Sequence, residues 1–172
     1  MKPLKNSLYL VIFLFLFLAI SIPADEPLVL LKTGRENYYF KDPIKFNVFL
    51  HEKSYLYIVN LRSNGEMHLL YPNEFEENNL LEKGNYSIPS EKDDYFFYAG
   101  EPEGKEILFA LVSRTPVQKL QKKLHYKNPI VKQKAGSNLS TTLLNWLTSE
   151  LPYGDWDLSE VHIRVYKNRV KE

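Results

Sequence analysis

The sequence predicts a mainly β domain of the α+β class: an antiparallel β-sandwich-like domain with one or two helices packed near its C-terminal part. Three observations lead to this prediction. Apolar residues occupy every second position over residues 44–50, an Asn-Gly pair separates two apolar runs at residues 64–65, and leucines recur at helical spacing over residues 139–151. Twelve tyrosines and ten phenylalanines add the aromatic side chains that strands favour.

The N-terminal segment is predicted to direct export. Two lysines precede thirteen consecutive apolar residues, Leu8–Ile20, and Ala24 offers a small residue at a cleavage point. This layout is typical of a secretory signal peptide over residues 1–24, because thirteen apolar residues are short for a bilayer span. An uncleaved membrane anchor stays open as the alternative. Residues 25–172 then form one globular domain, in the periplasm or outside a bacterial cell.

Most of the domain is predicted to consist of strands. The first is a short apolar run, residues 28–31, and the alternating segment 44–50 follows it. The segment 55–61 has apolar residues on both faces and is expected to be a central strand. Asn64-Gly65 predicts a tight hairpin, because both residues tolerate the positive φ of such a turn. The later strands are expected at residues 67–71, 86–88, 94–98, 107–112 and 161–165.

Two helices are predicted between the last two strands. The first is short and places Val117, Leu120 and Leu124 on one face. The second has five leucines on one face from Leu139 to Leu151. Residues 115–172 are therefore expected to form a helical segment followed by a final strand.

Charge is nearly balanced overall but uneven along the chain. Twenty-two bases face 21 acids, and the net charge of +1 argues against a nucleic-acid binder. The segment 107–149 contains seven bases and no acid, whereas acids gather over residues 74–106. The basic stretch 114–134 either pairs with these acids or binds an envelope protein or an anionic envelope component. The lysines expected to make such a contact are Lys119, Lys122, Lys123 and Lys127.

No linear motif identifies a catalytic or metal site. The sequence has no cysteine, which excludes disulfides, thiolate catalysis and Cys-based metal sites. His51-Glu52 begins like the zinc-binding pattern H-E-x-x-H, but Tyr55 stands where the second histidine must be. We therefore expect no cofactor and no metal.

A small envelope hydrolase, with a site assembled only by the fold, stays open as an alternative. Its residues are expected at Tyr71, Pro72 and Asn73 in the loop after the hairpin, together with Glu103 and Glu106, because loops carry chemistry on β scaffolds. The alternative to a catalytic role is a structural one for each residue. Asn73 then caps a turn, and Glu106 lies at a strand end with its carboxylate bonded to backbone.

Several short motifs resemble a known bacterial family. They are Tyr55-Leu56-Tyr57, Gly65, Leu70-Tyr71-Pro72-Asn73, Ile88-Pro89 and Pro102-Glu103-Gly104-Lys105-Glu106. Their order is similar to that of the domain-of-unknown-function 4384 family over about residues 35–114, with Tyr71 where that family usually has phenylalanine.

This family has no established catalytic activity and occurs as an accessory module, often beside proteases, kinases or surface repeats. The resemblance therefore implies an interaction role without naming a ligand. Together with the export segment, it predicts an exported, non-catalytic binding or assembly module. If the N-terminal segment is retained, a membrane-tethered structural protein is the alternative.

Overall fold

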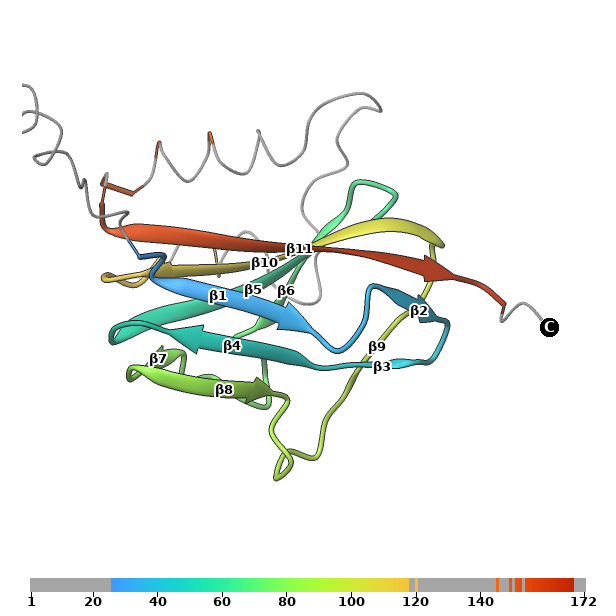
Figure 1. Ribbon diagram of the computed structural model, residues 1–172, viewed down its shortest axis with the longest axis horizontal. Coiled ribbons are helices and arrows are strands. Elements are labelled where there is room, and N and C mark those ends of the chain that lie inside the picture. The colour runs from blue at the N-terminus through green and yellow to red at the C-terminus, as the bar shows by residue number, and fades with distance from the viewer. Residues whose placement is uncertain are drawn as a thin grey trace, which may run out of the picture.

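The structure is a computed structural model that describes residues 26–117, 120, 145, 149, 151–152 and 154–168. The predicted export segment, residues 1–24, lies outside these residues. The described part is mainly β, as the sequence predicts, and its strands form two larger sheets and a short ribbon (Figure 1). Within it, no helix has the length and apolar character that a membrane span requires.

Eleven strands are delimited in the described part of the chain. They are β1 (Val29–Thr33), β2 (Asn37–Tyr39), β3 (Pro43–Ile44), β4 (Phe46–Leu50), β5 (Ser54–Leu61), β6 (Met67–Tyr71), β7 (Leu80–Leu81), β8 (Gly84–Ile88), β9 (Phe97–Tyr98), β10 (Gly104–Ser113) and β11 (Trp156–Tyr166).

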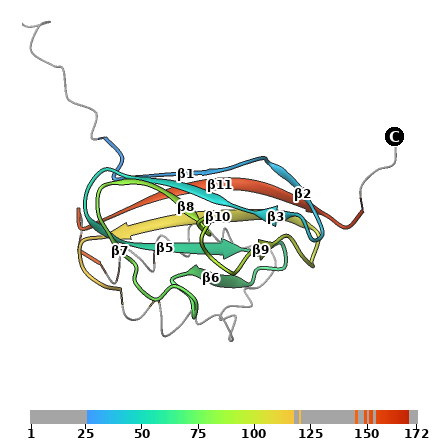
Figure 2. The same ribbon diagram turned by 90° about the horizontal axis from the view of Figure 1, so that it is seen from below.

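The small sheet has the strand order β1-β4-β8, and the large sheet has the order β2-β11-β10-β5-β6, with β7 also paired to β5. Figure 2 shows the large sheet in this sequence from β11 through β10 and β5 to β6. All pairs are antiparallel except β2 with β11, which is parallel. A separate ribbon joins β3 and β9.

The first core lies between the two sheets. Strand β4 contributes every second residue to it, because side chains alternate between the two faces of a strand. This confirms the alternation predicted for residues 44–50. The fully buried side chains of this core include Phe46, Leu50, Leu56, Ile58 and Leu108.

A second core covers the opposite face of β5 and β10, so these two central strands are buried on both sides. Tyr57 is fully buried there, and its hydroxyl accepts a hydrogen bond of 2.8 Å from the backbone N–H of Val117. Leu120 and Leu151, from the connection between β10 and β11, belong to the same core. The central position predicted for residues 55–61 is therefore confirmed.

The two predicted helices are not supported by the described part of the chain, where no helix is delimited. Most of their residues lie outside that part. Val117 and Leu120 belong to the same buried core, as their spacing predicts, and Leu120 N–H donates to Val117 O at 3.0 Å. Apolar spacing reports burial against the sheet and does not by itself set the length of a helix.

The Asn64-Gly65 hairpin is confirmed between β5 and β6. Gly65 has φ 83°, a value that glycine adopts without the steric cost of a Cβ atom. Asn64 Oδ1 accepts the backbone N–H of Glu66 at 3.1 Å, and Arg62 N–H donates to Glu66 O at 2.8 Å. This turn sets the register that brings polar side chains of β5 and β6 together at one end of the large sheet.

Candidate functional site

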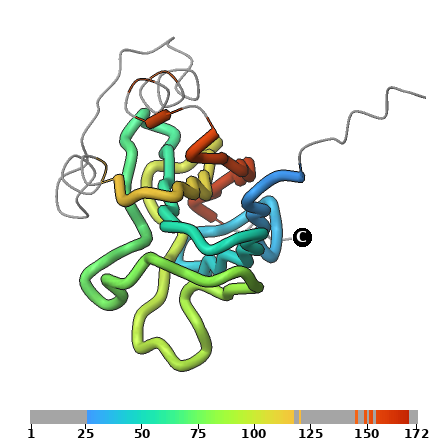
Figure 3. Tube along the Cα trace, turned by 90° about the vertical axis from the view of Figure 1, so that its left-hand side faces the viewer, coloured from blue at the N-terminus to red at the C-terminus, as the bar shows by residue number. Residues whose placement is uncertain are grey.

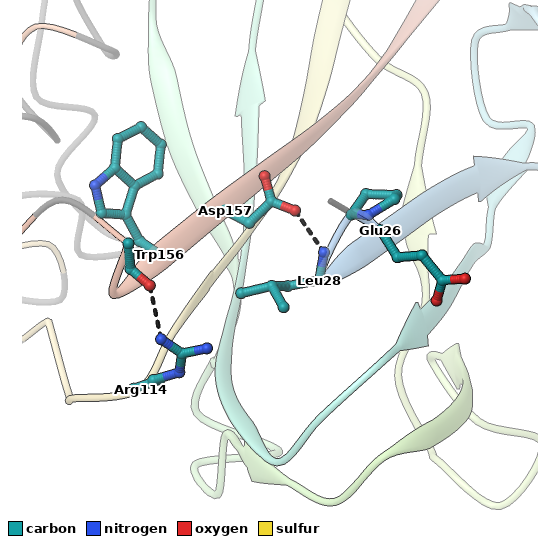
Figure 4. Close-up of a pocket in the computed structure, with 7 residues that line it drawn as sticks. Glu26, Leu28, Arg114, Trp156 and Asp157 are labelled. Carbon is teal, nitrogen blue, oxygen red and sulfur yellow. Dashed lines mark hydrogen bonds between the residues drawn. The ribbon is translucent and has the colours of Figure 1, made fainter. Parts of the chain in front are cut away.

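A cavity of about 480 Å³ lies at one end of the sandwich, and we call it the Arg114 pocket. Its described lining consists of residues 26–28, Arg114, Gly154, Trp156 and Asp157. Antiparallel pairing of β10 with β11 places Ser113 opposite Trp156, so Arg114 and the start of β11 are neighbours. Figure 4 shows Arg114 and Trp156 on one side of the pocket and Glu26 on the other.

The guanidinium of Arg114 is held in place from two directions. Its Nε donates to Glu52 Oε1 at 2.8 Å and its Nη2 to Oε2 at 3.3 Å, while Nη1 donates to the carbonyl of Gly154 at 2.8 Å. The hydrogen bond and charge of Glu52 raise the pKa of Arg114 above its usual value. The side chain is nevertheless 49% exposed. It is therefore a fixed cation that still faces solvent.

Asp157 connects the two strands that flank the pocket. Its Oδ2 accepts the backbone N–H of Leu28 at 2.6 Å, and its Oδ1 accepts that of Leu158 at 2.8 Å (Figure 4). Both carboxylate oxygens are thus engaged with backbone. Trp156 is partly buried against the second core and gives the pocket an apolar wall.

The opposite end of the large sheet buries a carboxylate. Glu106, near the start of β10, is 3% exposed. Its Oε2 accepts a hydrogen bond of 2.8 Å from Asn60 Nδ2, and its Oε1 lies 3.8 Å from Arg62 Nε. Burial raises the pKa of Glu106, and the Asn60 hydrogen bond and the Arg62 charge oppose this rise.

His68 of β6 lies beside this group, because it pairs with Asn60 across the hairpin. Burial lowers the pKa of His68, which favours the neutral imidazole. We call Asn60, Arg62, His68 and Glu106 the Glu106 cluster. Three of its buried atoms make no hydrogen bond within the described structure: Asn60 Oδ1, His68 Nε2 and Glu106 Oε1.

A second cavity, of about 460 Å³, opens beside the Glu106 cluster. Its lining includes Arg62, Asn64, Glu66, Glu103 and Lys167. Arg62 belongs both to this lining and to the cluster, so the cavity and the cluster adjoin at this residue. Three carboxylates and two cations in the full lining give no excess of the kind that selects a strongly charged ligand.

The sequence placed candidate residues at Tyr71, Pro72 and Asn73, and these have structural contacts. Tyr71 is fully buried and donates its hydroxyl to the carbonyl of Asn78 at 2.7 Å. Asn73 caps the following turn, since its Oδ1 accepts the N–H groups of Phe75 and Glu76 at 2.9 and 3.0 Å. Pro72 is buried between them.

The structure does not join these residues to the other predicted candidates. Tyr71 pairs with Ile58, whereas Glu106 lies near Arg62 at the far end of β5. Glu103 and Glu106 do lie at the same end of β10, but Glu106 bonds side chains and not backbone as expected. Four lysines predicted to contact an envelope partner lie outside the described residues: Lys119, Lys122, Lys123 and Lys127.

Sequence reasoning missed the Arg114 pocket. Its residues come from three separated segments, and only the register between β10 and β11 brings Arg114 beside Trp156 and Asp157. The available signal was that Arg114 and Trp156 each flank a long apolar or alternating segment. That signal marks strand ends, but it does not pair them.

The fold and its pockets define a β-sandwich domain with cavities at its strand ends. Residues 37–116 match the family model described as Domain of unknown function (DUF4384). The match confirms the resemblance seen in the motifs: this part of the chain is similar to that family. No curated protein and no solved structure matches the chain.

The matched segment covers β2 to β10 and ends just beyond Arg114. Strand β11, which supplies Trp156 and Asp157, lies after it. The Arg114 pocket is therefore assembled from the matched segment, from residues 26–28 before it and from the start of β11 after it. The three prolines of the family-like motifs, Pro72, Pro89 and Pro102, each follow a cis peptide bond.

Proposed function

We propose that the protein is an exported, non-catalytic binding module that contacts a partner of the cell envelope through the Arg114 pocket. The observation that supports this most directly is the guanidinium of Arg114. It is fixed by Glu52 and Gly154 beside Trp156, at the edge of a cavity of about 480 Å³. A pre-positioned donor next to an apolar wall is typical of a recognition site.

The described chemistry of the pocket favours binding over catalysis. The pKa of Arg114 is raised, so its guanidinium is a poor proton donor at neutral pH. Asp157 accepts two backbone N–H bonds, which holds its carboxylate in place and occupies the oxygens that a general base would use.

The ligand we propose for this pocket is a polar, uncharged stretch of an envelope protein. Arg114 has five N–H groups, and the bonds to Glu52 and Gly154 use three of them, so two can donate to ligand carbonyls. Glu26 and Asp157 balance the positive charge of the guanidinium, which disfavours a strongly anionic ligand here. An anionic partner of the lysines at 119–127 remains a separate proposal.

The test compares two arginines that are alike in exposure and pairing. Arg114 is 49% exposed and paired with Glu52, and Arg35 is 50% exposed and paired with Asp42 at 3.2 Å. Purified protein without residues 1–24 is immobilised and incubated with envelope extract at low and moderate salt. We expect Arg114→Gln to reduce retained envelope protein about tenfold, whereas Arg35→Gln retains as much as the parent protein.

Equal retention by the two variants would count against the Arg114 pocket, and no retention by the parent protein would count against a binding role.

The hydrolase alternative is tested by incubating the protein with glycan, ester and peptide substrates. Turnover that disappears on changing one side chain would replace the binding proposal. The intact mass of the native protein tests export, because a chain that keeps residues 1–24 is instead tethered or retained.

A further inference from the structure

Two loops meet on the side of the sandwich away from the Arg114 pocket. They are the β6–β7 loop, residues 72–79, and the β8–β9 loop, residues 89–96, and both project from the body of the domain (Figure 3). Phe75 of the first loop stacks on Tyr95 of the second, with ring centroids 5.2 Å apart and planes inclined by 13°. We call this stacked pair the Phe75 platform.

The Phe75 platform is anchored in the first core. Tyr95 is 9% exposed and meets Phe97 edge-on at 5.4 Å, and Phe97 in turn packs against Phe46 at 5.3 Å. The hydroxyl of Tyr95 donates to Glu76 Oε2 at 3.0 Å, which ties the two loops together. The position of the platform is therefore set by core packing.

Phe75 itself is 66% exposed. One ring face lies on Tyr95, so the exposure belongs to the other face and the ring edge. A large apolar side chain that stays exposed to solvent buries little of its surface, so it contributes little to the stability of the folded chain. An exposed aromatic ring with a fixed position is instead typical of a contact site for a partner.

The surroundings of the platform are acidic. Residues 72–79 and 89–96 together contain six acids and one base, Lys92. Four of these acids are exposed, and none forms an ion pair within the described part of the chain: Glu74, Glu77, Glu91 and Asp94. Burial raises the pKa of Tyr95, and the charges of Glu76 and Asp93 add to the rise.

We propose that the Phe75 platform binds a cationic segment of a partner polypeptide, with an arginine guanidinium stacked on the open face of Phe75. The ring attracts a cation placed over its face, and arginine is the cation that most often makes this contact. The exposed carboxylates complement the remaining positive charge and guide the approach of the segment. This site goes beyond the Arg114 pocket and does not depend on it.

The basic stretch 114–134 of the same chain also carries complementary charge. The described start of this stretch lies away from the Phe75 platform, because Val117 packs in the second core whereas the platform is anchored in the first core. We therefore assign the platform to a partner chain. Self-association through the basic stretch of a second copy is an outcome that the test detects.

The experiment uses three labelled peptides of equal length, in which arginine, lysine or glutamate alternates with glycine. Fluorescence anisotropy measures their binding to the purified protein at low salt and at increasing salt. We expect the arginine peptide to bind most tightly, the lysine peptide more weakly and the glutamate peptide not at all. Affinity for the arginine peptide should fall as salt rises.

Phe96 provides a matched control for Phe75. It is 62% exposed, and it contacts Tyr98 on the opposite side of the segment that contains Tyr95 and Phe97. Phe75→Ala should weaken the arginine peptide about tenfold, whereas Phe96→Ala should leave its affinity unchanged. The double variant Glu74→Gln/Glu77→Gln keeps the ring and should lower both the affinity and its salt dependence.

Several results would overturn the proposal: no binding of the arginine peptide at low salt, equal losses in Phe75→Ala and Phe96→Ala, or equal binding of the glutamate peptide. A salt-sensitive dimer in sedimentation that Phe75→Ala abolishes would assign the platform to self-association instead. Arg114→Gln should leave peptide binding unchanged. A failure of the Arg114 pocket is therefore distinguishable from a failure of the Phe75 platform.

Discussion

Two arginine–carboxylate pairs lie at opposite ends of β10, and they differ in burial. Glu106, near the start of the strand, is 3% exposed, and its Oε1 lies 3.8 Å from Arg62 Nε. Arg114, just past the end of the strand, bonds Glu52 at 2.8 Å, with side-chain exposures of 49% and 35%. The carboxylate of the first pair is part of the interior, whereas both side chains of the second pair are at the surface.

The difference shows that the same two chemical groups are in different environments at the two ends of one strand. Burial raises the pKa of Glu106, because the charged carboxylate loses its hydration. The pKa of Arg114 is raised by its partner, because the guanidinium keeps most of its hydration and gains Glu52. We infer that the Glu106 end contributes to stability and that the Arg114 end is available for binding.

The largest expected effect follows from removing the buried carboxylate. Glu106→Ala leaves the buried Asn60 Nδ2 without its acceptor and removes the carboxylate beside the partly buried Arg62, so we expect the free energy of unfolding to fall by about 3 kcal/mol. Urea unfolding measures this value. Glu52→Ala is the surface counterpart and should leave the unfolding midpoint unchanged. Similar losses in the two variants would remove the distinction between the two ends.

Gly104 sharpens the same comparison, because it lies at the Glu106 end and packs closely against the side chain of Ser63. It has φ 138°, and a Cβ atom there would lie 2.6 Å from the Cβ atom of Ser63. We expect Gly104→Ala to lower the free energy of unfolding by about 2 kcal/mol. Gly34 is the control, since a Cβ atom there meets nothing within 4 Å. A Gly34→Ala variant as unstable as Gly104→Ala would contradict this explanation.

The pH dependence of stability provides a third test of the buried end. The pKa of Glu106 is raised in the folded state above its usual value of 4.5, so the folded protein holds this proton more tightly than the unfolded chain. The stabilisation that the protonated Glu106 gives the folded state is fully present below pH 4.5. It is lost as the pH rises through the folded-state pKa of Glu106. We therefore expect the stability of the parent protein relative to Glu106→Gln to decrease over this range. Urea unfolding of both proteins in a pH series measures the difference, and a difference that grows with pH would show that the sign is wrong.

The smallest expected change in stability belongs to the exposed end. Arg114→Lys keeps the positive charge but cannot reproduce the two bonds to Glu52 together with the bond to Gly154, because an ammonium lacks the planar fork of a guanidinium. We expect an unchanged thermal midpoint and a loss of envelope retention like that of Arg114→Gln. A lowered midpoint with retained binding would assign Arg114 a structural role.

Local patterns predicted much of the strand arrangement. The alternating residues of β4, the apolar length of β5 and the Asn64-Gly65 turn each appear where the sequence places them. These features depend on contacts between near neighbours and on which side of a strand is buried. The two predicted helices are not supported by the described part of the chain, because most of their residues lie outside it and no helix is delimited within it.

The pairing of strands that lie far apart in the sequence was harder to predict from local patterns. Strand β11 begins at Trp156, five residues before its predicted start, because the less apolar residues 156–160 pair with residues 109–113 of β10. The parallel pairing of β2 with β11 has no local signal either. Both depend on which strands become neighbours in space.

The sequence by itself determined the longer strands of the matched segment (β4, β5, β6, β8 and β10), the tight hairpin and the uneven distribution of charge, because each of these is encoded by residues close together along the chain. Only the tertiary structure decided that Arg114 meets Trp156, that Phe75 stacks on Tyr95, and that Glu106 is buried beside Asn60. These contacts join segments far apart in the chain. The register of paired strands and the packing of two sheets set them, and no short run of residues records either.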